Sequence, residues 1–142
     1  DAAINALVEV GDHADRTGRT LAVQTHGQSP ESLESILKAL RCPSVGVCMD
    51  PAALLMVGHD PVECIARLAG NVRLSYARDA TLGGSDVEGH ETCLGDGHVD
   101  LPAYLAALDG AGYGGPQIIR RTSAEHPLAD IRRAFEILDS HL

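Results

Sequence analysis

The sequence predicts an α/β fold in which a parallel sheet is covered by helices. Short apolar runs of strand length alternate along the chain with segments whose apolar residues recur at helical spacing. Four such runs are each followed by a helical segment, and this alternation is typical of parallel βα units. Right-handed crossovers then leave two architectures, a (β/α) barrel or an open doubly wound sheet. No Gly-x-Gly-x-x-Gly follows the first run, so a dinucleotide-binding fold gains no support.

The first half of the chain predicts two helices, each followed by a strand. Residues 4–14 carry apolar side chains at helical spacing, and residues 20–24 form a short apolar run that predicts a buried strand. The Ser-Pro-Glu sequence at 29–31 is typical of a helix start, because serine caps the helix and proline suits its first position. Leucine and isoleucine within 33–40 mark the buried face of that helix, and residues 45–49 predict the second strand.

The second half of the chain repeats the alternation. Residues 80–100 are rich in glycine and predict a loop, and loops of this length are usually functional or mobile. The other predicted elements are a helix at 52–57, a helix at 60–68 that begins with an Asp-Pro cap, a strand at 71–77, a helix at 101–108, a strand at 116–120 and a helix at 128–138.

The composition predicts a single globular domain over residues 1–142. Hydrophobic residues make up 44% of the chain, which is enough to bury a core of ordinary domain size. The net charge of −9 repels phosphate backbones and anionic lipids, so we expect no nucleic-acid partner and no membrane partner. No apolar run is long enough to span a bilayer.

The cysteines indicate a reducing compartment. Cys42, Cys48, Cys64 and Cys93 form no Cys-x-x-Cys pair, and a chain with this much aliphatic core does not need a disulfide framework. We therefore expect a cytoplasmic location. The chain opens at Asp1 without a basic and then apolar leader, so a signal peptide is not expected, and the missing Met favours a fragment.

Five segments stand in a characteristic order along the chain. They are Leu-Ala-Val-Gln-Thr-His-Gly at 21–27, Val-Gly-Val-Cys-Met-Asp-Pro-Ala-Ala-Leu-Leu at 45–55, Gly-His-Asp-Pro-Val-Glu at 58–63, Leu-Gly-Asp-Gly-His-Val-Asp at 94–100 and His-Pro-Leu-Ala-Asp-Ile-Arg-Arg at 126–133. Taken together, they resemble one known family, the xylose isomerase-like TIM barrels of the sugar phosphate isomerase/epimerase group. The resemblance is to the C-terminal half of these barrels and covers nearly the whole chain. It implies four C-terminal βα units, a half-barrel whose N-terminal half is absent. Open sheet edges would then imply self-association or pairing with that missing half.

The resemblance also implies a metal site. Active members of this family hold a divalent ion at four strand ends with Glu, Asp, His and Glu. The ion polarises a sugar carbonyl, and two carboxylates move a proton through an enediol. On this sequence the four ligands fall on the candidate catalytic positions Gln24, Asp50, Tyr76 and Arg120. Of these four positions, only Asp50 keeps the family's ligand. Asp79, which is not one of the four positions, is also kept from the family's pattern. We therefore expect no cofactor, or a divalent ion (Mn²⁺, Co²⁺, Zn²⁺ or Mg²⁺) held through Asp50 if the protein is active.

The three replaced ligands would weaken such a site. Gln24 keeps a carbonyl oxygen but no charge, and Tyr76 is a poor ligand at neutral pH because a phenol has a pKa of about 10. Arg120 would place a permanent cation where the metal cation should bind. We hypothesise that Arg120 pairs with Asp50 and fills the vacated site. The alternative for Asp50 is that its Asp-Pro sequence simply caps the following helix.

Further residues are candidates for substrate contact. His26 stands two positions after Gln24 and resembles the family's Glu-x-His. Arg121 and Arg78 could join Arg120 in binding a phosphate or a carboxylate. The alternatives are a hydrogen-bonded, half-buried His26 and a solvated arginine pair at the strand end.

The glycine-rich loop also carries residue types that can bind zinc. Their spacing matches no zinc signature, so a flexible lid over the barrel mouth is the better interpretation. The residues are His90, Glu91, Cys93, Asp96 and His98.

Three functional hypotheses follow. In the first, the chain is part of a sugar phosphate isomerase/epimerase-like protein with a degenerate metal site and weak or no isomerase activity, which binds a sugar or an anionic metabolite. In the second, the full-length protein is an active, metal-dependent sugar isomerase or epimerase. In the third, the chain is a non-catalytic structural or interaction domain, whose mouth is closed by the pair of Asp50 and Arg120. Metal content separates the first two, and a thermal shift with sugars separates the first from the third.

Overall fold

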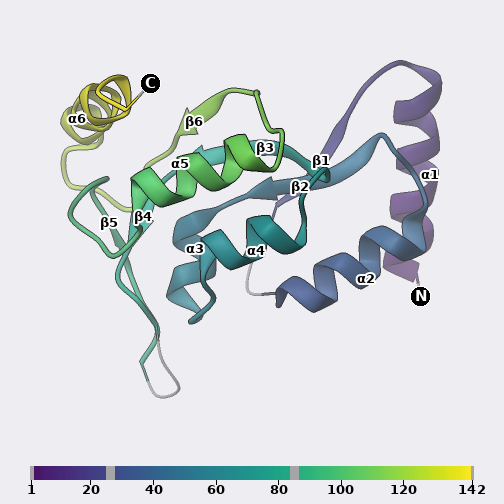
Figure 1. The fold of residues 1–142 in the computed structure, drawn as a ribbon, viewed down its shortest axis with the longest axis horizontal. Helices are drawn as coiled ribbons and strands as arrows, with labels where there is room; N and C mark the ends of the chain where they lie inside the picture. Colours follow the sequence, from purple (N-terminus) through teal and green to yellow (C-terminus); the bar gives the residue numbers. More distant parts are fainter. Residues whose placement is uncertain (1, 25–27, 84–86, 142) are drawn as a thin grey trace.

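The computed structural model describes residues 2–24, 28–83 and 87–141. This part of the chain forms six helices and six strands, arranged as shown in Figure 1. The helices are α1 (Ala2–Arg16), α2 (Pro30–Leu40), α3 (Pro51–Met56), α4 (Pro61–Arg67), α5 (Leu101–Gly110) and α6 (Pro127–Asp139). The strands are β1 (Leu21–Gln24), β2 (Val45–Met49), β3 (Val72–Ala77), β4 (Asp79–Ala80), β5 (Glu91–Thr92) and β6 (Gln117–Ile119).

The main sheet has four parallel strands in the order β1-β2-β3-β6. Strand order follows chain order, and every strand-to-strand connection in this sheet passes through at least one helix. The four βα units predicted from the sequence are therefore confirmed, as is the parallel sheet. Because the strands are parallel, all their carboxyl ends meet at one edge of the sheet.

The segment predicted as a loop contains a small second sheet. β4 and β5 pair antiparallel, with Asp79 opposite Thr92 and Ala80 opposite Glu91. Each of these strands has only two residues, which is too short for an alternating apolar pattern to show in the sequence. The pairing places β4 and β5 side by side, next to the end of the main sheet that carries α6 (Figure 1).

Helix starts follow the local signals in the sequence. α2 to α5 each begin with an Asp or Ser cap whose side chain accepts a hydrogen bond from a backbone N–H of the first turn. Proline stands in the first turn of all four of these helices, where its missing N–H costs nothing. The caps are Ser29, Asp50, Asp60 and Asp100.

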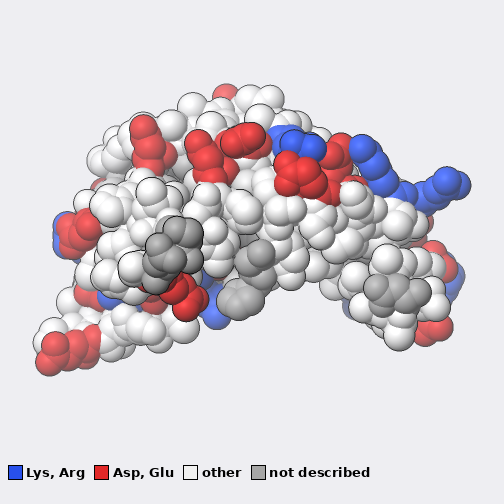
Figure 2. All heavy atoms as spheres, turned by 90° about the horizontal axis from the view of Figure 1, so that it is seen from below, with Lys and Arg blue, Asp and Glu red and all other residues white. Residues whose placement is uncertain are grey.

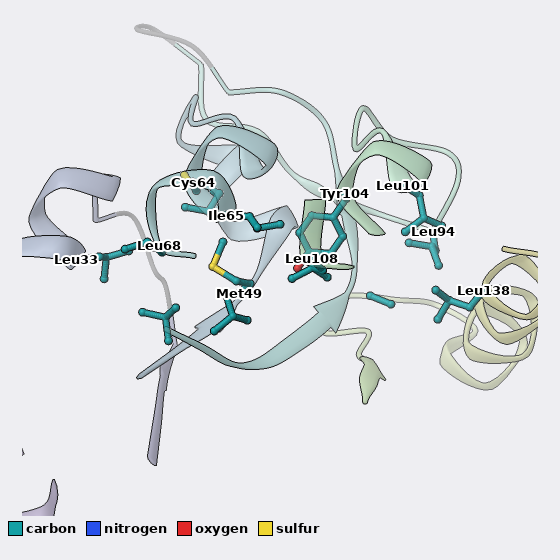
Figure 3. Close-up of a cluster of buried hydrophobic side chains, with 14 of the residues drawn as sticks. Leu33, Met49, Cys64, Ile65, Leu68, Leu94, Leu101, Tyr104, Leu108 and Leu138 are labelled. Atoms are coloured by element: carbon teal, nitrogen blue, oxygen red, sulfur yellow. The ribbon is translucent and has the colours of Figure 1, made fainter. Parts of the chain in front are cut away.

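The core lies between one face of the main sheet and the helices that cover it. α2, α4 and α5 lie side by side along this face (Figure 1), and their apolar side chains meet those of β2 and β3 (Figure 3). The largest buried side chain is that of Tyr104, whose hydroxyl shares a 2.7 Å hydrogen bond with Ser75 Oγ. The fully buried members of this cluster are Val47, Met49, Leu54, Cys64, Ile65, Leu68 and Tyr104.

The molecule has the shape expected of half a barrel. Seen from below the view of Figure 1, its outline is an arch with a concave side (Figure 2). β1 and β6 are the edge strands of the main sheet, and each has a strand neighbour on one side only within the described residues. Among the described residues, no helix combines the length and the apolar character needed to cross a bilayer.

Candidate functional site

The structure brings the four candidate catalytic positions together at the carboxyl ends of the main strands. Gln24 ends β1, Asp50 follows β2, Tyr76 lies near the end of β3 and Arg120 follows β6. Gln24 Nε2 donates to Asp50 Oδ2 at 2.9 Å, and Arg120 Nη1 donates to Gln24 Oε1 at 3.4 Å. Arg120 Cζ lies 5.4 Å from the centroid of the Tyr76 ring, within the range of a cation–π contact.

Asp50 caps α3, as the alternative for this residue predicts, and also forms polar contacts at the strand ends. Its Oδ1 accepts a hydrogen bond from Ala53 N at 3.1 Å, which caps α3. Its Oδ2 accepts from Gln24 and, at 2.5 Å, from Arg78 Nη1. The side chain is fully buried. The helix cap and the strand-end site therefore share one carboxylate.

The prediction that Arg120 forms the ion pair with Asp50 is wrong. The arginine that pairs with Asp50 is Arg78, from the neighbouring strand end, and its side chain is only 7% exposed. Burial lowers the pKa of the Arg78 guanidinium, but the negative charges of Asp50 and Glu91 outweigh burial and raise it. Arg78 is therefore charged at neutral pH.

Glu91 is the residue of this site that sequence reasoning assigned to another role. Its side chain is 6% exposed and accepts hydrogen bonds from Arg78 Nε at 2.9 Å and Arg78 Nη2 at 2.7 Å. The backbone N–H groups of Thr122 and Ser123 donate to its Oε2 at 2.9 and 2.8 Å. No spacing signal marks it, because its position depends on the short pairing of β4 with β5.

These contacts control the ionisation of Glu91. Burial raises the pKa of its carboxyl, but hydrogen bonds from Arg78, Ser123 and Thr122 together outweigh burial, and the pKa lies below its ordinary value. The carboxylate is therefore a fixed negative charge at neutral pH. It ties the β4–β5 hairpin to the segment that follows β6.

The other substrate candidates have different surroundings. Arg121 Nε donates to Asp130 Oδ2 on α6 at 2.9 Å, and Arg121 Nη1 lies 3.1 Å from Glu91 Oε2. Arg121 therefore links α6 to β5 through two ion pairs, which indicates a structural role for its guanidinium. His26 lies outside the described residues. Arg120 remains exposed at the strand ends.

Asp79, which is kept from the family pattern, organises the segment that leads into α5. Its two oxygens accept four backbone hydrogen bonds, and the side chain is nearly fully buried. A carboxylate that receives this many N–H bonds holds its loop in one conformation. The donors are the N–H groups of Ala80, Gly95, Gly97 and Val99, at 2.8, 3.0, 2.9 and 3.0 Å.

The zinc hypothesis for the loop cluster gains no support. Glu91 binds arginine, Asp96 pairs with Arg133 at 2.5 Å, and His98 Nδ1 accepts from Leu82 N at 2.9 Å. In the ranges 2–24, 28–83 and 87–141, no three His, Cys, Asp or Glu side chains converge as a metal site would require. The flexible lid remains a prediction. At the described ends of this segment, Asp79 accepts from Gly97 N and Glu91 accepts from Thr122 N.

Cys48 lies behind the strand-end site. Burial raises the pKa of its thiol to about 11, and the negative charge of Asp50 acts in the same direction. The thiol is therefore protonated at neutral pH and is a weak nucleophile.

The strand ends border a cavity of about 380 Å³, within the range of roughly 300–1,000 Å³ that is usual for small-molecule sites. A larger cavity of about 490 Å³ lies on the helical side, between the starts of α4 and α5. Its lining includes His98 of the loop cluster but none of the candidate catalytic or substrate-contact residues. The residues that line the strand-end cavity are Gln24, Ala53, Met56, Arg78, His90, Glu91, Arg120, Thr122 and Ser123.

The donor set of this site does not suit a divalent cation. Asp50 Oδ2, the oxygen that a metal would need, already receives N–H groups from Gln24 and Arg78. The guanidinium of Arg78 contacts Asp50 Oδ2 directly. The guanidinium of Arg120 donates to Gln24, which in turn donates to Asp50. Guanidinium groups have no lone pair for a metal and repel it by charge.

Comparison with known proteins finds similarity to one protein family. The sequence profile of a family described as xylose isomerase-like TIM barrel matches residues 1–141. A xylose isomerase domain protein from Planctomyces limnophilus is 27% identical with a TM-score of 0.90, and the match covers 97% of this chain and 52% of that one. No curated protein matches the sequence.

Two further solved structures share the fold at lower identity. A D-tagatose 3-epimerase-like protein is 19% identical with a TM-score of 0.78, and the match covers 97% of this chain and 52% of that one. A xylose isomerase-like TIM barrel protein from Mycobacterium smegmatis, in complex with magnesium, is 20% identical with a TM-score of 0.79. That match covers 100% of this chain and 51% of the other. The chain thus spans about half the length of the structures it resembles.

Proposed function

Because the chain belongs to the xylose isomerase-like TIM barrel family, we propose that its strand-end cavity binds a sugar or an anionic metabolite without a resident metal. The observation that carries this proposal is that Asp50 Oδ2 accepts hydrogen bonds from Arg78 and Gln24. The chain supplies half of a barrel, so the activity of a whole protein is part of the same proposal.

The proposal includes weak or no isomerase activity. An enediol mechanism needs two carboxylates that take up and return a proton on neighbouring carbons. Gln24 and Arg120 occupy the positions where the family resemblance implies these carboxylates. An amide and a guanidinium cannot act as general bases at neutral pH. The cavity therefore has polar groups that can recognise a ligand. The two positions at which the resemblance implies proton-transferring carboxylates carry Gln24 and Arg120 instead.

Metal content is the first test. The chain is purified without chelator, offered Mn²⁺, Co²⁺, Zn²⁺ or Mg²⁺ in turn, freed of unbound ion and measured by elemental analysis, with circular dichroism to show that it is folded. We expect well under one ion per chain. About one ion per chain, lost in Asp50→Ala, would contradict the proposal and support the second hypothesis, an active isomerase or epimerase.

A third hypothesis, a non-catalytic structural or interaction domain, is favoured by the strand-end ion pairs. The links from Asp50 to Arg78 and from Arg78 to Glu91 support a structural role for these strand-end residues. A ligand of the native state must raise the melting temperature, whereas a purely structural domain gains nothing from sugars. Melting curves with and without sugars and sugar phosphates therefore separate these hypotheses.

The proposal also includes a partner that completes the barrel. β1 and β6 each have an unpaired edge within the described residues, and unpaired edges are places where another chain can add strands. Either an N-terminal half with four further βα units or a second copy of this chain would cover both edges.

A further inference from the structure

We propose that Arg120 is the anchor for an anionic group on a polyhydroxylated ligand, either a carboxylate or a phosphate. This inference rests on the proposed function, because it names the class of molecule that the metal-free cavity takes. Arg120 stands where the family resemblance implies an acidic metal ligand, so the site has exchanged a carboxylate for a guanidinium.

The arginines near the strand ends differ in their partners. Arg78 is paired with Asp50 and Glu91, and Arg121 is paired with Glu91 and Asp130. Arg120 is exposed and forms no ion pair with any residue that the structure describes. Within the cavity lining it is therefore the cation whose charge is not already matched by a protein carboxylate.

Arg120 is also held in place. Its guanidinium lies over the ring of Tyr76 with 5.4 Å between Cζ and the centroid, and its Nη1 points at Gln24 Oε1. An arginine stacked on an aromatic face loses less freedom when it binds an anion, because its orientation is set beforehand. Its remaining N–H groups can form the two parallel hydrogen bonds that a carboxylate or a phosphate accepts.

The other groups of the cavity suit hydroxyls. Thr122 and Ser123 follow Arg120 along the lining and carry hydroxyl groups, and Gln24 offers an amide. Asp50 and Glu91 pair with Arg78, so the lining presents the polar atoms of Gln24, Thr122 and Ser123 beside the unpaired charge of Arg120. A sugar ring needs both donors and acceptors, because each of its hydroxyls donates and accepts.

The test is a calorimetric titration of the chain at low ionic strength with four probes. Two probes, D-gluconate and D-glucose 6-phosphate, carry an anion on a polyol, and they separate the carboxylate and phosphate sources. D-Glucose lacks the anion, and inorganic phosphate lacks the polyol. We expect binding of at least one of the first two, and weaker binding of the last two.

The variants Arg120→Gln and Arg120→Lys examine the residue itself. Loss of a charge-assisted bidentate contact should weaken binding of the anionic probe about tenfold or more in Arg120→Gln, and less in Arg120→Lys. Arg19→Gln is the matched control, since Arg19 is exposed and precedes β1 at the opposite end of the sheet. It makes the same change in net charge and should leave the affinity unchanged.

Several results would overturn the inference. These are equal binding of D-glucose, equal binding of inorganic phosphate, affinity that survives in Arg120→Gln, and no binding of either anionic polyol at millimolar concentration by the folded chain. They leave the metal measurement untouched, so a metal-free site with a neutral ligand remains distinguishable from a failure of the proposed function. The chain's net charge of −9 disfavours anion binding elsewhere on the surface.

Discussion

Glu91 is a buried carboxylate whose partners are the guanidinium groups of Arg78 and Arg121 and backbone N–H groups of the segment after β6. We expect Glu91→Gln to lower the free energy of unfolding by about 3–5 kcal/mol, because it leaves the buried guanidinium of Arg78 with one carboxylate fewer. Urea unfolding followed by circular dichroism measures this loss.

Glu88→Gln is the control for that change. Glu88 lies in the same excursion but is exposed, so the same substitution should alter stability by less than about 0.5 kcal/mol. Equal effects of the two variants would mean that the contacts of Glu91 contribute nothing to the fold.

Glu91 also predicts how stability depends on pH. Its pKa is lower in the folded chain than the ordinary value of 4.5, because hydrogen bonds from Arg78, Ser123 and Thr122 outweigh burial. A group with a depressed folded pKa stabilises the protein fully above the unfolded pKa, and this contribution is lost as the pH falls through the folded pKa. We expect the free energy of unfolding to fall below pH 4.5, and to fall less steeply in Glu91→Gln. A parallel fall in both proteins would contradict this assignment.

At the scale of single residues, the sequence predicted which side chains meet but not which of them pair. Gln24, Asp50, Tyr76 and Arg120 converge as expected, because parallel strands place their carboxyl ends together. Asp50 pairs with Arg78 and not with Arg120 because of the direction in which each arginine side chain extends between neighbouring strands. Strand alternation alone does not determine that direction.

At the scale of elements, the segment between β4 and α5 depends on close contact with Asp79. A Cβ on Gly97 would lie 2.2 Å from Asp79 Oδ1 and 2.6 Å from Thr92 Oγ1. We expect Gly97→Ala to lower the free energy of unfolding by about 2–3 kcal/mol, since the loop must move and weaken its hydrogen bonds to Asp79. Thermal unfolding of the variant measures the loss.

Gly110→Ala is the matched control for this substitution. Gly110 ends α5, and a Cβ there meets no atom within 4 Å. Because alanine favours a helix more than glycine does, this variant should be neutral or slightly more stable. A Gly97→Ala variant as stable as Gly110→Ala would show that the loop tolerates a side chain beside Asp79.

The main elements were predictable because each carries a strong local signal. Strand β2 is a continuous apolar run, β1 and β6 carry shorter apolar runs, and helices α2 to α5 begin with an Asp or Ser cap and proline. β4 and β5 carry no such signal, since they are two-residue strands held by tertiary contacts of Asp79 and Glu91. The elements that sequence reasoning missed are therefore those that long-range polar contacts create.

At the scale of the whole molecule, the half-barrel leaves apolar surface beside its open edge. Leu128, Ile131 and Phe135 follow helical spacing along α6 and are 74%, 38% and 62% exposed. Ile118 of the edge strand β6 is 39% exposed. An apolar helix stripe next to an unpaired strand is a surface that another chain can cover, through both side-chain burial and strand pairing.

This surface predicts that the chain associates with itself in the absence of another half-barrel. We expect sedimentation velocity to show a mass that rises from one chain toward two with concentration, and Phe135→Lys to shift this equilibrium toward the single chain. A charged side chain in the centre of an apolar contact must be desolvated, which opposes association. Val57→Lys is the control, because Val57 is 44% exposed in the turn after α3, away from β6 and α6. A single-chain mass at every concentration, or equal effects of the two lysine variants, would show that association does not use this surface.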